Sequence, residues 1–171
     1  MLKKIFMGLM IGCLSLSAGI TSVPKKDLQG IKDYVKSVKL SDLTIEMMAF
    51  RNKEHPLPTK LDEASTLISY AIGDTSASLL SIVEVDKQTL INSINRLFKR
   101  RKINIVYDEK MFDEKIGGNF GPKMFNVMKN VHCLNAIDNI YLNKGVIFQY
   151  KYIWNDKKPI IDFTIAAEDC N

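Results

Sequence analysis

The sequence predicts a single α+β domain in which helices pack on an antiparallel sheet of about four strands, with one disulfide. Stretches with apolar residues three or four apart, typical of amphipathic helices, are interspersed with stretches of alternating apolar and polar residues, typical of strands. A helix followed by a hairpin occurs twice, so two such units are expected to join into one sheet covered by helices on one face. A hydrophobic fraction of 46% suffices for a conventional core.

Residues 1–19 have the layout of a bacterial export signal. Two lysines precede an uncharged apolar run over residues 5–14, and small and hydroxyl residues follow it. A membrane anchor is the other interpretation, but serines and threonines interrupt the roughly 20 mostly apolar residues that a span requires. Ser17 and Gly19 suit a cleavage site that leaves residues 20–171 as the mature domain, and a cut after Ser17 fits nearly as well.

A lipoprotein signal is the alternative for the same segment. The stretch "MIGC" would make Cys13 the lipidated first residue of the mature protein. Met10 fits less well than the leucine usual at that position, and the apolar stretch before Cys13 is short, so a removed signal is preferred. The predicted location is periplasmic or secreted, with a membrane-anchored lipoprotein as the alternative.

The number of cysteines also favours export. The chain has three, and removal or acylation of Cys13 leaves only Cys133 and Cys170. In an oxidising compartment these two most simply form one disulfide, which would stabilise the fold by roughly 4 kcal/mol on the chain-entropy model. Two free buried thiols are the alternative.

Residues 24–55 are predicted to be helical. Two amphipathic stretches occur there, the second with a plausible N-cap at Ser41, and Pro56 and Pro58 then require an extended connector. The apolar stripes consist of Leu28, Ile31, Val35 and Val38 in the first stretch and Leu43, Met47 and Phe50 in the second.

Residues 59–171 are predicted to run hairpin, helix, helix, hairpin. The first hairpin turns near Gly73 and Asp74, and a helix follows over residues 87–102. The stretch "INIVYDE" is expected to form a short strand, "KIGGNFGP" a loop, and Pro122 the start of another helix.

The C-terminal helix and hairpin are the most clearly predicted elements. The stretch "CLNAIDNIYLNKG" has helical spacing with a stop at Gly145, and two alternating strands follow on either side of "NDKKP". A helix followed by strands running up and down brings its own start near the end of the final strand. Cys133 and Cys170 are therefore expected to be neighbours.

The same unit resembles small exported bacterial proteins of uncharacterised function with a C-terminal Cys, helix, Gly, hairpin, Cys arrangement. The resemblance covers the last 40 residues well and brings no catalytic residues with it. It rests on Cys133, Gly145, Tyr150, Asp156, Ile161, Phe163, Ile165, Asp169 and Cys170.

A basic cluster, "RLFKRRK", ends the helix predicted over residues 87–102. It contains Arg96, Lys99, Arg100, Arg101 and Lys102. Cations are favourable at a helix C-terminus, which explains the cluster without any ligand. The alternative is a docking patch for an acidic partner protein, a cell-wall polymer or anionic headgroups. Nucleic acid is not expected as a partner, because no stacking platform is evident.

The final hairpin carries several aromatic residues. Phe148 and Tyr150 are assigned to the core. Trp154, close to the turn, is the candidate for an exposed interface residue because Trp is favoured at protein interfaces.

No catalytic motif, metal-ligand spacing or phosphate-binding loop occurs in the sequence, so no cofactor and no metal are expected. The sequence therefore predicts an exported, non-enzymatic protein of the cell envelope that binds a protein partner or an envelope component. The alternative is a small secreted enzyme or effector that uses Cys133 as nucleophile with His132 as base.

Overall fold

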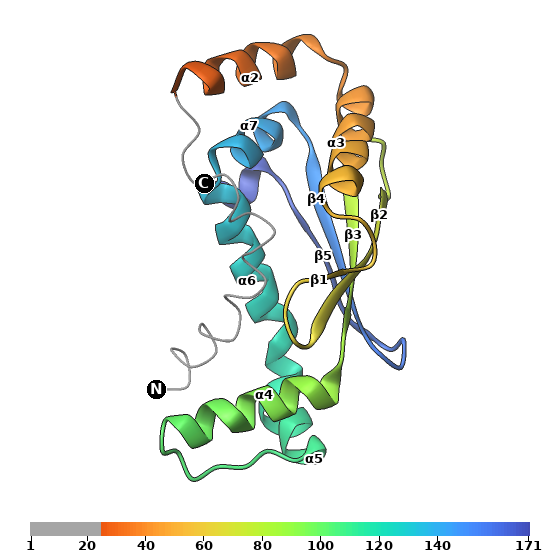
Figure 1. The fold of residues 1–171 in the computed structure, drawn as a ribbon. Helices are drawn as coiled ribbons and strands as arrows, with labels where there is room; N and C mark the ends of the chain where they lie inside the picture. Colours follow the sequence, from red (N-terminus) through yellow and green to blue (C-terminus); the bar gives the residue numbers. More distant parts are fainter. Residues whose placement is uncertain (1–24) are drawn as a thin grey trace.

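The computed structural model describes residues 25–171 (Figure 1). The predicted signal peptide, its cleavage site and Cys13 lie outside the described residues. The helical elements are α2 (Lys25–Ser37), α3 (Leu40–Glu54), α4 (Lys87–Arg100), α5 (Glu109–Phe112), the π-helix η2 (Asp113–Gly117), α6 (Gly118–Leu134), α7 (Ala136–Lys144) and the 3-10 helix η3 (Ala167–Cys170).

Five strands form one sheet, in the order β1-β2-β3-β4-β5. They are β1 (Thr59–Lys60), β2 (Ser65–Ile72), β3 (Ser78–Val85), β4 (Ile147–Trp154) and β5 (Pro159–Ile165). The predicted α+β class is confirmed, and both predicted hairpins are present as β2–β3 and β4–β5. The expected count of about four strands was one too low, because the two-residue β1 is too short to show a period in sequence.

The sheet is mixed, so the prediction of a purely antiparallel sheet was wrong. Strand β3 pairs with β4 in parallel, with Ser78 opposite Ile147 and Val85 opposite Trp154. The parallel pairing results from the helical crossover formed by α4 to α7. This crossover leaves the end of β3 and brings the chain back to the start of β3, where β4 begins. A parallel pair requires such a long connection, whereas a short turn can make only an antiparallel hairpin.

Helices cover the face of the sheet that carries the large apolar side chains. Phe148, Tyr150 and Tyr152 alternate along β4 on this face and are buried, as predicted for the first two. Helix α3 packs on β2 and β3, and α6 packs on β5. Among the described helices, none is long and apolar enough to cross a bilayer.

A close helix-to-strand contact occurs where α6 crosses β5. A Cβ added to Gly121 would lie 2.7 Å from Cδ1 and 3.1 Å from Cβ of Ile161. Glycine therefore lets the backbone of α6 lie closer to the Ile161 side chain than any other residue would allow. Helix formation also begins earlier than predicted: the stretch "KIGGNFGP" is helical, and Pro122 lies inside α6.

Cys133 and Cys170 form a disulfide, as the cysteine count predicted. Their Cα atoms lie 5.3 Å apart, within the normal range for a disulfide. The bond joins the last turn of α6 to η3 at the end of the chain. It therefore fastens the C-terminus to the helix that covers β5.

Candidate functional site

The predicted basic cluster lies at the end of α4, at the opposite end of the fold from α2 (Figure 1). Asp86 caps the start of α4 by accepting a hydrogen bond from the Thr89 N–H at 2.7 Å. Helix α4 then ends at Arg100, and Lys102 turns the chain with a left-handed φ of 56°. All five basic side chains of the cluster are exposed.

A groove of about 690 Å³ lies between α4 and the segment that follows it. Three of the predicted cations, Arg96, Lys99 and Lys102, line it together with Thr89, Asn92 and Asn95 of α4 and with residues 103–106. The cations were predicted from the sequence. The opposite wall was not predicted, because "INIVYDE" was expected to be a strand and forms neither strand nor helix over residues 103–108.

Asn95 fixes the distance between the two walls. Its Nδ2 donates to the Tyr107 carbonyl at 2.8 Å, and its Oδ1 accepts from the Tyr107 N–H at 2.8 Å. The Tyr107 ring packs against Phe98 with centroids 5.6 Å apart, and the Ile103 N–H donates to the Phe98 carbonyl at 3.0 Å. The segment is thus held at both ends, and its middle is left facing outward.

The middle of this segment exposes apolar side chains. Val106 is 76% exposed and Ile105 is 41% exposed. Single exposed apolar residues are ordinary on a protein surface. Here two adjacent ones border a groove whose other wall carries cations, so the groove combines an apolar wall and a positively charged wall.

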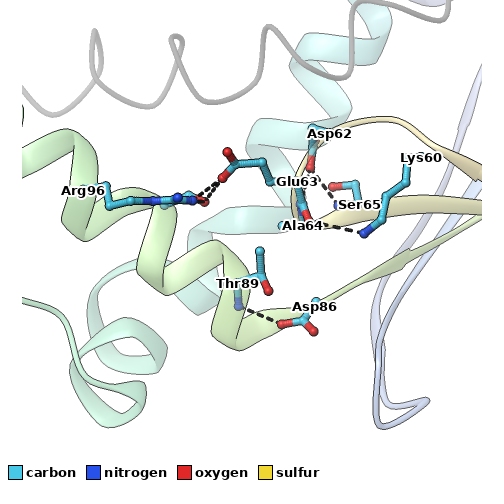
Figure 2. A network of polar contacts seen from close by, with 9 residues as sticks. Lys60, Asp62, Glu63, Ala64, Ser65, Asp86, Thr89 and Arg96 are labelled. Atoms are coloured by element: carbon cyan, nitrogen blue, oxygen red, sulfur yellow. Dashed lines mark hydrogen bonds and ion pairs between the residues drawn. The ribbon is translucent and has the colours of Figure 1, made fainter.

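Arg96 differs from the other cations because it has a partner. Figure 2 shows its guanidinium paired with Glu63, whose Oε2 also accepts from Ser93 Oγ at 2.9 Å. Glu63 lies in the turn between β1 and β2, where Asp62 Oδ1 accepts from the Ala64 and Ser65 N–H groups at 2.8 and 2.7 Å. Arg96 therefore fastens α4 to the β1–β2 turn.

The remaining cations of the cluster are available for an anionic partner. Within residues 25–171, no ion pair or side-chain hydrogen bond involves Lys99, Arg100, Arg101 or Lys102. Four unpaired charges close together at a helix end repel one another, and an anionic ligand would relieve that repulsion.

Trp154 does not lie in the groove. Its ring is half-buried and packs between Phe112 and Phe120, with centroid distances of 6.1 and 5.8 Å. The Lys87 ammonium lies 5.7 Å from its centroid. The expected exposed aromatic residue thus contributes to packing of α5 and α6 on the sheet.

A second polar cluster is buried around His132. Its Nδ1 lies 2.8 Å from Asp138 Oδ2, and its Nε2 lies 2.6 Å from the Tyr150 hydroxyl. The ring stacks on Phe148 at 4.0 Å, and Arg51 pairs with Asp138 at 3.6 Å. Burial lowers the pKa of His132, although its hydrogen bond to Asp138 opposes this shift.

This buried cluster does not bring His132 and Cys133 together as a base and a nucleophile. Both ring nitrogens of His132 face other partners, and the sulfur of Cys133 is bonded to Cys170. A thiolate is required for nucleophilic attack. Among the described residues there is also no group of three side chains suited to hold a metal ion. The buried polar cluster around His132 instead links α3, α6, α7 and β4.

His132 was a candidate from the sequence, whereas Asp138 and Arg51 were not. Asp138 follows His132 by six residues, across the break between α6 and α7 at Asn135. Neither a helical nor a strand period connects two residues across such a break. Only the fold brings them together.

No protein-family model and no curated protein sequence matches this chain. Solved structures do resemble it. A protein from Pseudomonas aeruginosa that is named as secreted aligns with a TM-score of 0.52 at 15% identity, over 78% of this chain and 99% of that chain. This likeness indicates a shared fold.

Two pilotins of type II secretion systems align less well. The protein EpsS of Vibrio vulnificus has a TM-score of 0.46 at 10% identity, over 84% of this chain and 97% of its own. The protein AspS of Vibrio cholerae has a TM-score of 0.47 at 10% identity, over 77% of this chain and 92% of its own. These scores are too low for a shared fold to be inferred.

Proposed function

We propose that this chain is an exported, non-enzymatic protein of the bacterial cell envelope that binds a partner protein through the groove between α4 and residues 103–106. The observation that carries the proposal is the composition of this groove: the exposed apolar residues Ile105 and Val106 line it together with the cations Arg96, Lys99 and Lys102. Contiguous exposed apolar surface with a polar rim is characteristic of interaction sites.

The contacts that hold the walls of the groove together support a binding role. The segment 103–107 is held to α4 by Asn95, and α4 is held to the β1–β2 turn by Arg96 and Glu63. A site whose walls are already in place loses little conformational entropy when its ligand arrives. Ile105 and Val106 lie between Ile103 and Tyr107, which are both hydrogen-bonded to α4.

Export is proposed from the leader and agrees with the disulfide. Residues 1–19 read as a removed signal, and Cys133 and Cys170 are bonded as expected in an oxidising compartment. The proposed location is the periplasm, with a membrane anchor through Cys13 as the alternative form of the same protein. The bonded state of Cys133 supports a role without a cysteine nucleophile.

Site-specific photocrosslinking in the native host tests this function. A photoreactive phenylalanine analogue placed at Val106 is expected to give one discrete crosslinked protein in the envelope fraction. The matched control places the analogue at Thr164, an exposed position on β5 outside the groove. The proposal fails if Val106 gives no crosslink, or only the same products as Thr164.

A further inference from the structure

We infer that the groove takes an acidic polypeptide segment, with carboxylates that pair with Lys99 and Lys102 and apolar side chains that pack on Ile105 and Val106. This inference rests on the proposed function and adds the chemistry of the partner. It predicts which side chains a partner must present and where they must lie.

Charge complementarity is the first argument. Glu63 already neutralises Arg96, so the groove itself keeps Lys99 and Lys102, with Arg100 and Arg101 close by in sequence. The C-terminus of α4 contributes only about half a negative charge, which these four cations exceed. If a segment without carboxylates docked here, these cations would stay unpaired. They would also lose part of their hydration.

The backbone of the segment gives a second, independent argument. Ile103 and Tyr107 have hydrogen-bond partners, but in the described part of the chain no hydrogen bond involves the backbone of residues 104–106. Backbone N–H and C=O groups need partners when they are covered. A polypeptide can supply such partners along with its side chains, as when a strand is added to an exposed edge.

Other occupants fit these features less well. The predicted signal, residues 1–19, carries Lys3 and Lys4 and no acidic residue, so its charge does not complement the groove. A lipid surface offers anionic headgroups, but the site is concave and lies between two walls. A second copy of the chain could supply carboxylates, and the experiment below separates this case from the others.

The test is selection from a phage-displayed library of random dodecapeptides on the disulfide-bonded protein, followed by titration of the best fluorescent peptide. Enriched peptides are expected to combine Asp or Glu with Ile, Leu or Val. Binding is expected to weaken at least about tenfold for Lys99→Glu with Lys102→Glu, and also for Val106→Asp. The matched control, Lys32→Glu with Lys151→Glu, makes the same charge change at exposed positions outside the groove and should bind normally.

Several results would overturn the inference. One is enrichment of peptides without acidic residues, and another is equal binding to all variants. Failure of every peptide together with binding to phosphatidylglycerol vesicles that depends on Lys99 and Lys102 would assign the groove to a lipid surface. Self-association that Val106→Asp abolishes would assign it to a second copy. If crosslinking at Val106 succeeds while acidic peptides fail, the partner's chemistry is wrong and the proposed function stands.

Discussion

Asn95 and Tyr107 are joined by two hydrogen bonds, in which one side-chain amide satisfies both the N–H and the carbonyl of a residue twelve positions later. No regular secondary structure holds residues 103–108, so this amide takes the place of a strand partner. The outward position of Ile105 and Val106 follows from it.

Replacement of Asn95 should therefore loosen the groove wall. Asn95→Ala removes both hydrogen bonds and is expected to lower the free energy of unfolding by about 1 to 3 kcal/mol. Urea denaturation measures this loss, and hydrogen exchange at the Tyr107 amide should accelerate. Asn92→Ala is the matched control, since among residues 25–171 the Asn92 side chain makes one hydrogen bond, which it accepts from Gln88 at the surface. Equal stability of the two variants would contradict the role given to Asn95.

The contact between Gly121 and Ile161 yields a second prediction. Gly121→Ala places a methyl group 2.7 Å from Ile161 Cδ1, so α6 or the Ile161 side chain must move. The expected cost is about 1 to 3 kcal/mol of unfolding free energy, as in other overpacked cores. Gly118→Ala lies in the same helix, and its new Cβ would meet no described atom within 4 Å outside the neighbouring helix backbone. It should be neutral or up to about 1 kcal/mol stabilising. Thermal unfolding of both variants provides the comparison, and a stable Gly121→Ala protein would show that the interface yields easily.

These same residues show what the sequence could predict. The two hairpins and the helix over residues 87–102 were predictable because their apolar periods are local, and the disulfide followed from counting cysteines. The helical state of "KIGGNFGP" was not, since glycine and proline locally favour a loop. Gly121 packs on Ile161, a contact between residues far apart in the sequence that no local pattern reveals.

The candidate site, too, could be predicted only in part from the sequence. Its cations were visible as a cluster, because they adjoin one another in the sequence. Its apolar wall was not, because the outward position of Ile105 and Val106 depends on Asn95, on another element. The parallel pairing of β3 with β4 was likewise hidden, since it depends on where the crossover returns the chain.

The disulfide should contribute strongly to stability. Cys133 and Cys170 are 37 positions apart, and closing a loop of that length restricts the unfolded chain by about 4 kcal/mol on the chain-entropy model. The double variant Cys133→Ala with Cys170→Ala should lose a comparable free energy of unfolding in urea. A reductant should destabilise the wild-type protein and leave the double variant unchanged. A loss much smaller than about 2 kcal/mol would mean that packing of η3 on α6 holds the C-terminus without the bond.

His132 should make stability depend on pH in one direction. Burial lowers its pKa in the folded protein, and the groups that face it are Asp138 on α7, Arg51 on α3 and Tyr150 on β4. Below the unfolded value of about 6.5 the unfolded chain binds a proton that the folded chain resists, so stability falls as pH falls.

The expected slope is about 1.4 kcal/mol per pH unit below about pH 6.5, continuing until the folded pKa is reached, and no loss from this group is expected above that range. His132→Gln keeps hydrogen-bonding capacity toward Asp138 and Tyr150 but cannot titrate. It should be less stable than wild type near neutral pH, because its side chain cannot reproduce the stacking on Phe148. Urea denaturation of both proteins between about pH 5.5 and about 7.5 isolates the contribution of this one group. The difference in stability between them should shrink as the pH is lowered, because only the wild type loses stability through this histidine. A difference that stays constant across the range would show that His132 takes up its proton as readily in the folded protein as in the unfolded chain.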